Sequence, residues 1–331
     1  MSVAGHGGPV VGWMDSPAFD RHETYVGHPE SPARLTAIRA RLDQTGLSRR
    51  LHSATPNPID RGLLERVHSR DYIARIEALS AAGGGQLDED TAVGRDTLQA
   101  ARLASGAVAD AVDRVLRGTW TRAFCSVRPP GHHASRNRGM GFCIFNNVAI
   151  GAAAALERPA VQRVAVLDWD AHHGNGTQDI FGRDERVFYG SWHQFPFYPY
   201  TGAPSENSTG PGRGTVVNCP MPAGSGDREL AAAWSEQIEP ALTTFHADVL
   251  FISAGFDADR RDPLTTLNVT TAGFRDLSTS VVAWADRYCN GRIVSVLEGG
   301  YHLVALAEDV EAHVRALLHM EEGRDDLAGT I

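Results

Sequence analysis

Short apolar runs alternate along the chain with longer segments in which apolar residues recur at helical spacing. Five runs are rich in β-branched residues and span 123–127, 164–167, 187–189, 249–252 and 293–297. Because they are apolar on both faces, they are typical of parallel strands that helices cover on each side. Helices are predicted over 31–46, 98–116, 230–245 and 271–289; the first has Ser31 as its N-cap and Pro32 at its first position. The pattern predicts an α/β fold in which a central, mostly parallel β-sheet carries helices on both faces.

Polar residues follow four of these runs at the point where each predicted strand ends. They occupy 128–133 (RPPGHH), 168–173 (DWDAHH), 253–257 (SAGFD) and 298–301 (EGGY). Ligands of open α/β sheets bind beyond the carboxyl ends of the strands, so these four segments would converge on one rim. We therefore expect the active site at the C-terminal ends of the strands.

Three residues of these segments form a candidate metal site. Asp170 and His172 are two positions apart, so in an extended segment their side chains point the same way. Asp257, at the end of another strand, supplies a third ligand. Three O and N ligands with an open position favour Zn²⁺, and the two carboxylates are also compatible with Fe²⁺ or Co²⁺. An isolated Asp-x-His pair usually lies on the surface, but this one ends a buried strand among other acids and histidines.

The remaining polar residues suit acid–base chemistry beside a metal. His132 and His133 follow two prolines and a glycine, which favour a fixed tight turn. Two imidazoles can act as base and acid at neutral pH, with Asp168 and Asn175 as candidate partners for their far nitrogens. Tyr301 follows two glycines, and its phenol is a good donor to a developing oxyanion.

Composition removes several classes of function. All 31 basic residues are arginines, so enzymes that need a lysine amine, including Schiff-base enzymes and P-loop hydrolases, are excluded. The four cysteines form no Cys-x-x-Cys pair, which argues against a thiolate zinc site and a disulfide framework. A net charge of −9 argues against nonspecific nucleic-acid binding. The apolar run at 148–156 is too short to cross a membrane, and no basic residue precedes Arg21, so we expect a cytoplasmic protein without a secretory signal.

Together these stretches resemble the histone deacetylase / acetylpolyamine amidohydrolase family, which has an arginase-like α/β fold. The resemblance begins at 28–34 (HPESPAR), includes 141–147 (GFCIFNN) and continues to about residue 317. The patterns DxDxHHGNG and EGGY are similar to those of class II deacetylases and their bacterial relatives. The resemblance implies one catalytic domain over 1–331, with its core at about 13–317.

The resemblance also implies an activity, the zinc-dependent removal of acyl groups from acyl-lysine-like amines. The three candidate ligands named above would bind Zn²⁺. His133, oriented by Asn175, would be the general base that activates water and then helps to protonate the leaving amine. His132, paired with Asp168, would be the more positive imidazole, and Tyr301 would polarise the scissile carbonyl.

Further sites follow from the resemblance alone. The family holds structural K⁺ or Na⁺, here at one site formed by Asp168, Asp170, His172, Ser191 and Trp192, and at a second near Phe181, Asp184 and Val187. The residues implied to contact the acylated substrate are Gly141, Phe142, Tyr198, Leu264 and Asp90. Gly141 would accept the substrate amide N–H, and Phe142 and Tyr198 would form the walls of the acyl-lysine tunnel. Leu264 would lie at the rim of the tunnel, and Asp90, in the loop at 88–91, would contact the substrate backbone.

Three other functions stay open at this point. The acidic charge suits acetylpolyamine or small-metabolite deacetylation, but Leu264 stands where polyamine-specific relatives can carry an acid. A dimanganese arginase-type enzyme needs more bridging carboxylates than the sequence offers. A non-catalytic acyl-lysine binding protein would be expected to lack a ligand, the base or the phenol, and all are present. The physiological substrate and the oligomeric state, a homo-oligomer included, are not fixed by the sequence.

Overall fold

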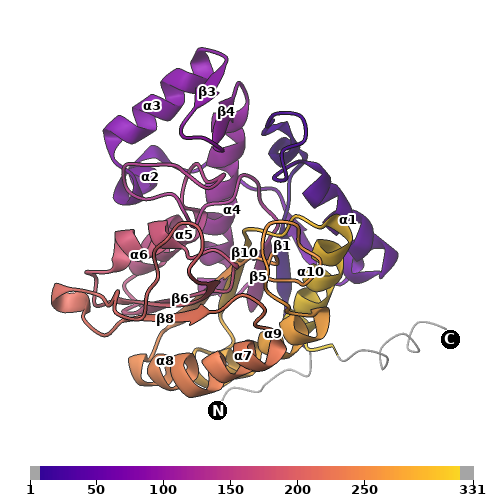
Figure 1. Cartoon of the computed structure of the whole chain (residues 1–331), viewed down its shortest axis with the longest axis vertical. Helices are drawn as coiled ribbons and strands as arrows, with labels where there is room; N and C mark the ends of the chain where they lie inside the picture. The colour runs from indigo at the N-terminus through magenta and orange to yellow at the C-terminus, as the bar shows by residue number, and fades with distance from the viewer. Residues whose placement is uncertain (1–7, 321–331) are drawn as a thin grey trace.

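The fold is built on one β-sheet in the computed structural model, which describes residues 8–320 (Figure 1). Its strands are β1 (Val11–Met14), β2 (His52–Ala54), β5 (Arg122–Cys125), β6 (Val164–Asp168), β7 (Val187–Gln194), β8 (Val216–Met221), β9 (Val249–Ala254) and β10 (Ile293–Leu297). They lie in the order β2-β1-β5-β10-β9-β6-β7-β8, and every neighbouring pair is parallel. The predicted α/β fold is confirmed. The prediction was a mostly parallel sheet, and this sheet is parallel throughout.

All five predicted strands are present, and the strands of this sheet that the sequence pattern missed, β1, β2 and β8, lie at or near its two edges. β10 has the predicted bounds, whereas β7 continues five residues past Tyr189, because Tyr189 to Gln194 pair with β8. β8 is an edge strand, in which polar and proline residues are tolerated because one side of the strand forms no ladder. Its half-buried pattern, which includes Pro220, therefore gives no continuous apolar run.

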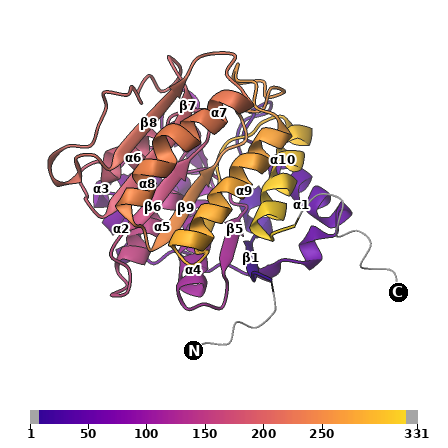
Figure 2. The same ribbon diagram turned by 90° about the horizontal axis from the view of Figure 1, so that it is seen from below.

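Helices cover both faces of the sheet, as Figure 2 shows. α4 (Thr97–Leu116) and α5 (Asn147–Leu156) pack on one face, and the other carries α1 (Ala33–Gln44), α7 (Asp227–Ala233), α8 (Glu239–Phe245), α9 (Thr271–Tyr288) and α10 (Leu303–Leu317). The remaining elements lie beside this core: α2 (Arg61–Val67), α3 (Arg70–Ala81), α6 (Asn175–Phe181) and the hairpin of β3 (Gly84–Gln86) and β4 (Ala92–Gly94). None of the helices between residues 8 and 320 is both long and apolar enough to cross a membrane.

Two predicted helices differ from the structure in detail. The first begins at Ala33, so that Pro32, and not Ser31, is its N-cap, and no side chain caps this helix end. The predicted helix over 230–245 begins earlier, at Asp227, and a π-helical turn at Trp234–Ile238 divides it into α7 and α8. A π turn inserts one residue into the helical repeat, which apolar spacing alone does not reveal.

Candidate active site

The sheet order brings the four polar segments together. β5, β10, β9 and β6 are consecutive neighbours in the centre of the sheet, and each is followed by one of these segments. Because all four strands are parallel, their carboxyl ends lie on the same edge. Residues from distant parts of the chain therefore converge there, as predicted.

Asp170, His172 and Asp257 meet at this edge. One potential ligand atom from each lies within 4.8 Å of the others. His172 Nδ1 is 3.1 Å from Asp170 Oδ1 and 2.8 Å from Asp257 Oδ2. Both carboxylates are buried, whereas His172 is partly exposed, so the cluster is reached from the side of the histidine.

The backbone around these carboxylates leaves no room for a larger residue at Gly299. A Cβ there would lie 2.5 Å from Asp257 Oδ2 and 2.6 Å from Asp170 Oδ2. The Gly299 N–H instead donates to Asp170 Oδ2 at 2.7 Å, and the Ala171 N–H donates to Asp257 Oδ1 at 2.8 Å. These bonds fix the carboxylates and leave their other oxygens facing His172.

The donor set fits a divalent cation. Burial lowers the pKa of His172, but the adjacent Asp170 and Asp257 carboxylates raise it to about 10, so a positive charge is favoured between them. Burial and the Asp170 carboxylate raise the pKa of Asp257 to about 7. Two carboxylates and one imidazole that favour a shared positive charge are chemically suited to hold Zn²⁺, Fe²⁺ or Co²⁺.

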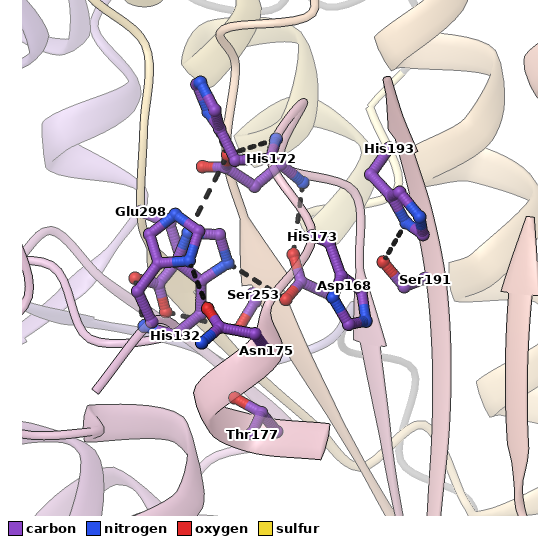
Figure 3. Close-up of polar contacts among 12 residues, drawn as sticks. His132, Asp168, His172, His173, Asn175, Thr177, Ser191, His193, Ser253 and Glu298 are labelled. Atoms are coloured by element: carbon purple, nitrogen blue, oxygen red, sulfur yellow. Dashed lines mark hydrogen bonds and ion pairs between the residues drawn. The ribbon is translucent and has the colours of Figure 1, made fainter. Parts of the chain in front are cut away.

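The two adjacent histidines have different partners and opposite electrostatics. His132 Nδ1 lies 3.1 Å from Asp168 Oδ2; burial lowers its pKa, but the Asp168 and Asp170 carboxylates raise it to about 10 (Figure 3). His133 Nδ1 lies 2.7 Å from Asn175 Oδ1. Burial, followed by the charges of His132 and His172, holds the pKa of His133 well below its usual value. The Asp168 and Asp170 carboxylates therefore favour the imidazolium form of His132. The neutral form of His133 is favoured, and because its Nδ1 faces an amide oxygen, Nδ1 donates and Nε2 is left as an acceptor.

Tyr301 lies near the metal cluster, since the charges of Asp170 and Asp257 contribute, after burial, to the shift in the pKa of its phenol. Its backbone N–H donates to Asp262 Oδ2 at 2.7 Å, and the Arg34 guanidinium lies 5.0 Å from its ring centroid. Its ring meets Phe142 edge-on, with 5.7 Å between the centroids. Burial raises the pKa of the phenol well above its usual value, so the hydroxyl stays protonated and can donate.

The residues expected to line the acyl-lysine tunnel also meet here. Gly141 has a φ of +55°, and a Cβ at this position would lie 3.1 Å from the Tyr198 hydroxyl. The Tyr198 ring is edge-on to His133 at 5.4 Å. Within residues 8–320 its buried hydroxyl has no hydrogen-bond partner. Phe142 is held by a bond from its N–H to Thr91 Oγ1 at 3.0 Å.

Asp90 and Leu264 form hydrogen bonds with neighbours of the site. The carbonyl of Asp90 lies 3.1 Å from His28 Nε2, and the His28 ring packs edge-on against Phe142 at 4.6 Å. The N–H of Leu264 donates to Asp262 Oδ1 at 2.9 Å, and Asp262 also holds Tyr301. Both residues are half-buried.

The two expected cation sites lie in different places. Asp168 pairs with Ser191 in the sheet register, which brings the first set together, and Ser191 Oγ lies 2.9 Å from His193 Nδ1. His193 Nε2 lies 2.9 Å from the Gly202 carbonyl, so the serine hydroxyl donates and keeps its lone pairs. The second set lies away from the active-site edge: Phe181 ends α6, Asp184 lies in the following turn and Val187 begins β7. There the Asp184 carboxylate accepts bonds from Arg186.

Two buried acids near the site were not singled out from the sequence. The carboxylate of Glu298 accepts bonds from the N–H groups of Gly131 and His132. Glu30 pairs with the buried guanidinium groups of Arg34 and Arg128. Glu298 directly follows a buried strand, which is a signal that could have indicated a role, whereas Glu30 pairs with a residue 98 positions away.

Comparison with known proteins identifies the family. The histone deacetylase domain matches residues 28–317. The chain is 40% identical to a histone deacetylase-like amidohydrolase of Pseudomonas aeruginosa, over 88% of this chain and 76% of that protein. It is 39% identical to an Archaeoglobus fulgidus protein named "Probable deacetylase", over 88% of this chain and 81% of the relative. The crystal structure of the HDA15 HD domain superposes with a TM-score of 0.90 at 34% identity, covering 94% of this chain and 89% of that one.

The chain therefore belongs to the histone deacetylase family. With this domain and these relatives, it is a hydrolytic deacetylase.

Proposed function

We propose that this protein is a zinc-dependent amidohydrolase that removes acetyl and other acyl groups from acyl-lysine-like amines. Its catalytic unit spans about residues 13–317. The observation that carries the proposal is the convergence of Asp170, His172 and Asp257, with ligand atoms within 4.8 Å, beside two histidines of opposite electrostatics.

The same three side chains hold the Zn²⁺, and Fe²⁺ or Co²⁺ would suit the same ligands. When bound, the ion supplies Lewis acidity, which lowers the pKa of water and polarises a carbonyl. The N–H groups of Gly299 and Ala171 orient the side chains of Asp170 and Asp257 before any metal binds. This support reduces the rearrangement that metal binding requires.

His133 is the general base. Its Nδ1 proton is held by Asn175 Oδ1, which leaves Nε2 free to take a proton from the attacking water. The same Nε2 proton then passes to the leaving amine nitrogen as the amide C–N bond breaks. His132 stays an imidazolium through Asp168, and its positive charge stabilises the negative charge that develops beside it.

Tyr301 is the oxyanion donor. Because burial keeps its phenol protonated, the hydroxyl can donate to the carbonyl oxygen as that oxygen becomes negative. Asp262 fixes the backbone of Tyr301, so the donor is already in position before substrate binds.

Five residues bind the substrate in this proposal. The Gly141 carbonyl accepts the amide N–H, and Phe142 and Tyr198 flank the aliphatic chain. The unpartnered Tyr198 hydroxyl makes its wall more polar than a phenylalanine would be. Leu264 and Asp90 contact the part of the substrate outside the walls.

Structural K⁺ or Na⁺ binds at the first of the two cation sites, formed by Asp168, Asp170, His172, Ser191 and Trp192. The support is the register of Asp168 with Ser191 and the free lone pairs of the serine hydroxyl. The second, formed by Phe181, Asp184 and Val187, is the weaker candidate, because Arg186 already neutralises Asp184.

Acetylpolyamine deacetylation is the second candidate. Acids at 88–90 lie near Tyr198, where Asp90 and Asp88 contribute, after burial, to the raised pKa of its phenol. These acids would attract a cationic amine, whereas Leu264 offers no charge at the rim. We expect a neutral acyl-lysine-like substrate to be preferred.

A substrate panel tests this order. Zinc-loaded protein is given acetyl-lysine peptides, longer acyl-lysines, acetylputrescine, acetylspermidine and small acetylated metabolites, and the released acid is measured. Fastest turnover of acyl-lysines supports the proposal. Equal or faster turnover of the polyamines favours the second candidate. No cleavage of any substrate, with unchanged ligand binding in Tyr301→Phe, would mean a non-catalytic binding protein.

A further inference from the structure

Glu298 is a buried acid that the proposed mechanism does not use. It directly follows β10, and its side chain is fully buried. One carboxylate oxygen, Oε2, accepts the Gly131 N–H at 2.7 Å and the His132 N–H at 3.2 Å. The other, Oε1, accepts from Ser253 Oγ at 3.2 Å (Figure 3). The carboxylate thus spans from β9 to the loop that carries both histidines.

Hydrogen bonds also hold the backbone of residues 298–300 in place. Arg34 donates to the carbonyls of Glu298 and Gly300, at 2.5 Å and 2.7 Å. The next residue, Gly299, donates its N–H to the metal-ligand candidate Asp170. The backbone of segment 298–301 therefore connects to the metal cluster through Gly299 and leads directly to Tyr301. The Glu298 side chain connects the same segment to the loop that carries the two histidines.

We propose that Glu298 is a positioning residue: its carboxylate holds the His132–His133 loop in register with the metal cluster and Tyr301 by accepting two backbone N–H groups. The inference rests on the proposed function, because it assigns the loop its part in catalysis. Glu298 acts through the backbone and does not touch the substrate.

The geometry separates this role from a role of the negative charge. Glu298→Gln keeps the length of the side chain, so its amide oxygen can accept both N–H groups while its NH₂ donates to Ser253 Oγ. Glu298→Asp keeps the charge but is one methylene shorter, so it cannot reach both the loop and Ser253. Ser253→Ala is the matched control, since it removes a bond to the same carboxylate but leaves both loop contacts.

The expected kinetic effect is on kcat. Because a displacement of about 1 Å can cost about 100-fold in rate, we expect Glu298→Asp to lower kcat by at least about 30-fold. Glu298→Gln and Ser253→Ala should stay within about threefold of the wild type. KM and bound zinc should change less than about twofold in all three variants, because the substrate and metal contacts are kept.

Hydrogen exchange of the Gly131 and His132 amides, measured by mass spectrometry, gives a readout that does not need activity. We expect wild-type protection in Glu298→Gln and faster exchange in Glu298→Asp. A Gln variant as impaired as the Asp variant, or an Asp variant with wild-type kcat and protection, overturns the inference. If the wild type cleaves no acylated amine, the proposed function fails, but the exchange data still decide whether Glu298 anchors the loop.

Discussion

Glu30 is a fully buried carboxylate between two buried arginines, and its removal should have a large, pH-dependent effect on stability. It accepts hydrogen bonds from Arg128 and lies 3.3 Å from Arg34 Nη1. Burial alone would raise the pKa of Glu30, but the charge and hydrogen bonds of Arg128, with His22 and Arg34, lower it from 4.5 to about 2. The ionised form is therefore strongly favoured in the folded protein.

The magnitude follows from this shift. One pKa unit corresponds to about 1.4 kcal/mol, so a pKa lowered from 4.5 to about 2 makes ionised Glu30 contribute about 3 kcal/mol at pH 7. Glu30→Gln also removes the negative charge that neutralises two buried guanidinium groups, and breaking buried ion pairs typically costs about 3–5 kcal/mol. Because the folded pKa is depressed, the contribution is complete above pH 4.5 and is lost as the pH falls towards 2.

Urea unfolding, followed by tryptophan fluorescence, measures the effect. We expect Glu30→Gln to lower the free energy of unfolding by about 3–5 kcal/mol at pH 7, and the difference from the wild type to shrink below pH 4.5. Glu65→Gln is the matched control, since Glu65 also contacts two arginines, Arg61 and Arg70, but at the surface. A loss below about 1 kcal/mol for Glu30→Gln, or a loss equal to that of the control, would refute the reasoning.

Three further predictions concern the site and the pH dependence of stability. Tyr301→Phe removes the oxyanion donor and should lower kcat by about 100-fold, with KM and zinc content unchanged. Steady-state kinetics measure kcat and KM, and an unchanged kcat would contradict the role of the phenol. Asp309 has a pKa raised to about 8, chiefly by burial, so its contribution to stability is complete below about pH 4 and is lost as the pH rises through 8. Asp309→Asn should therefore reduce the fall in urea midpoint between pH 5 and 9, with the exposed Asp43→Asn as control, and parallel curves would contradict this. Zinc binding to the metal-free protein should release about one proton at pH 8, from His172, and more at pH 6, where Asp257 is also protonated. Calorimetry in buffers of different ionisation enthalpy measures the number of protons released, and the absence of any release would contradict the prediction.

The sequence predicts the centre of the fold better than its edges. Strands such as β10 are apolar on both faces, so composition alone marks them. β1 contains Gly12, and β2 consists of His52, Ser53 and Ala54, so neither forms a continuous run of β-branched apolar residues. The π turn at Trp234–Ile238 depends on packing of the whole helix, which apolar spacing does not encode.

In the candidate site too, some residues could be assigned from the sequence and others could not. Asp170 and His172 could be assigned because they are close in sequence and end a buried strand, and the sheet order then brings Asp257 to them. The contacts of Glu298 with Gly131 and of Glu30 with Arg128 join residues 167 and 98 positions apart. Such contacts depend on how the loops are placed relative to one another. A single sequence therefore shows the motifs that contain Glu298 and Glu30, but not the residues that they contact.

Metal stoichiometry measured together with turnover tests the central claim most directly. The protein is stripped with a chelator, titrated with Zn²⁺, and assayed on an acetyl-lysine peptide while bound metal is measured by mass spectrometry. We predict that deacetylation is lost on stripping and restored at one Zn²⁺ per chain, and that Asp257→Asn lowers both the affinity for Zn²⁺ and the turnover. Full activity in the stripped protein, or a requirement for two bound ions per chain, would contradict the proposed site.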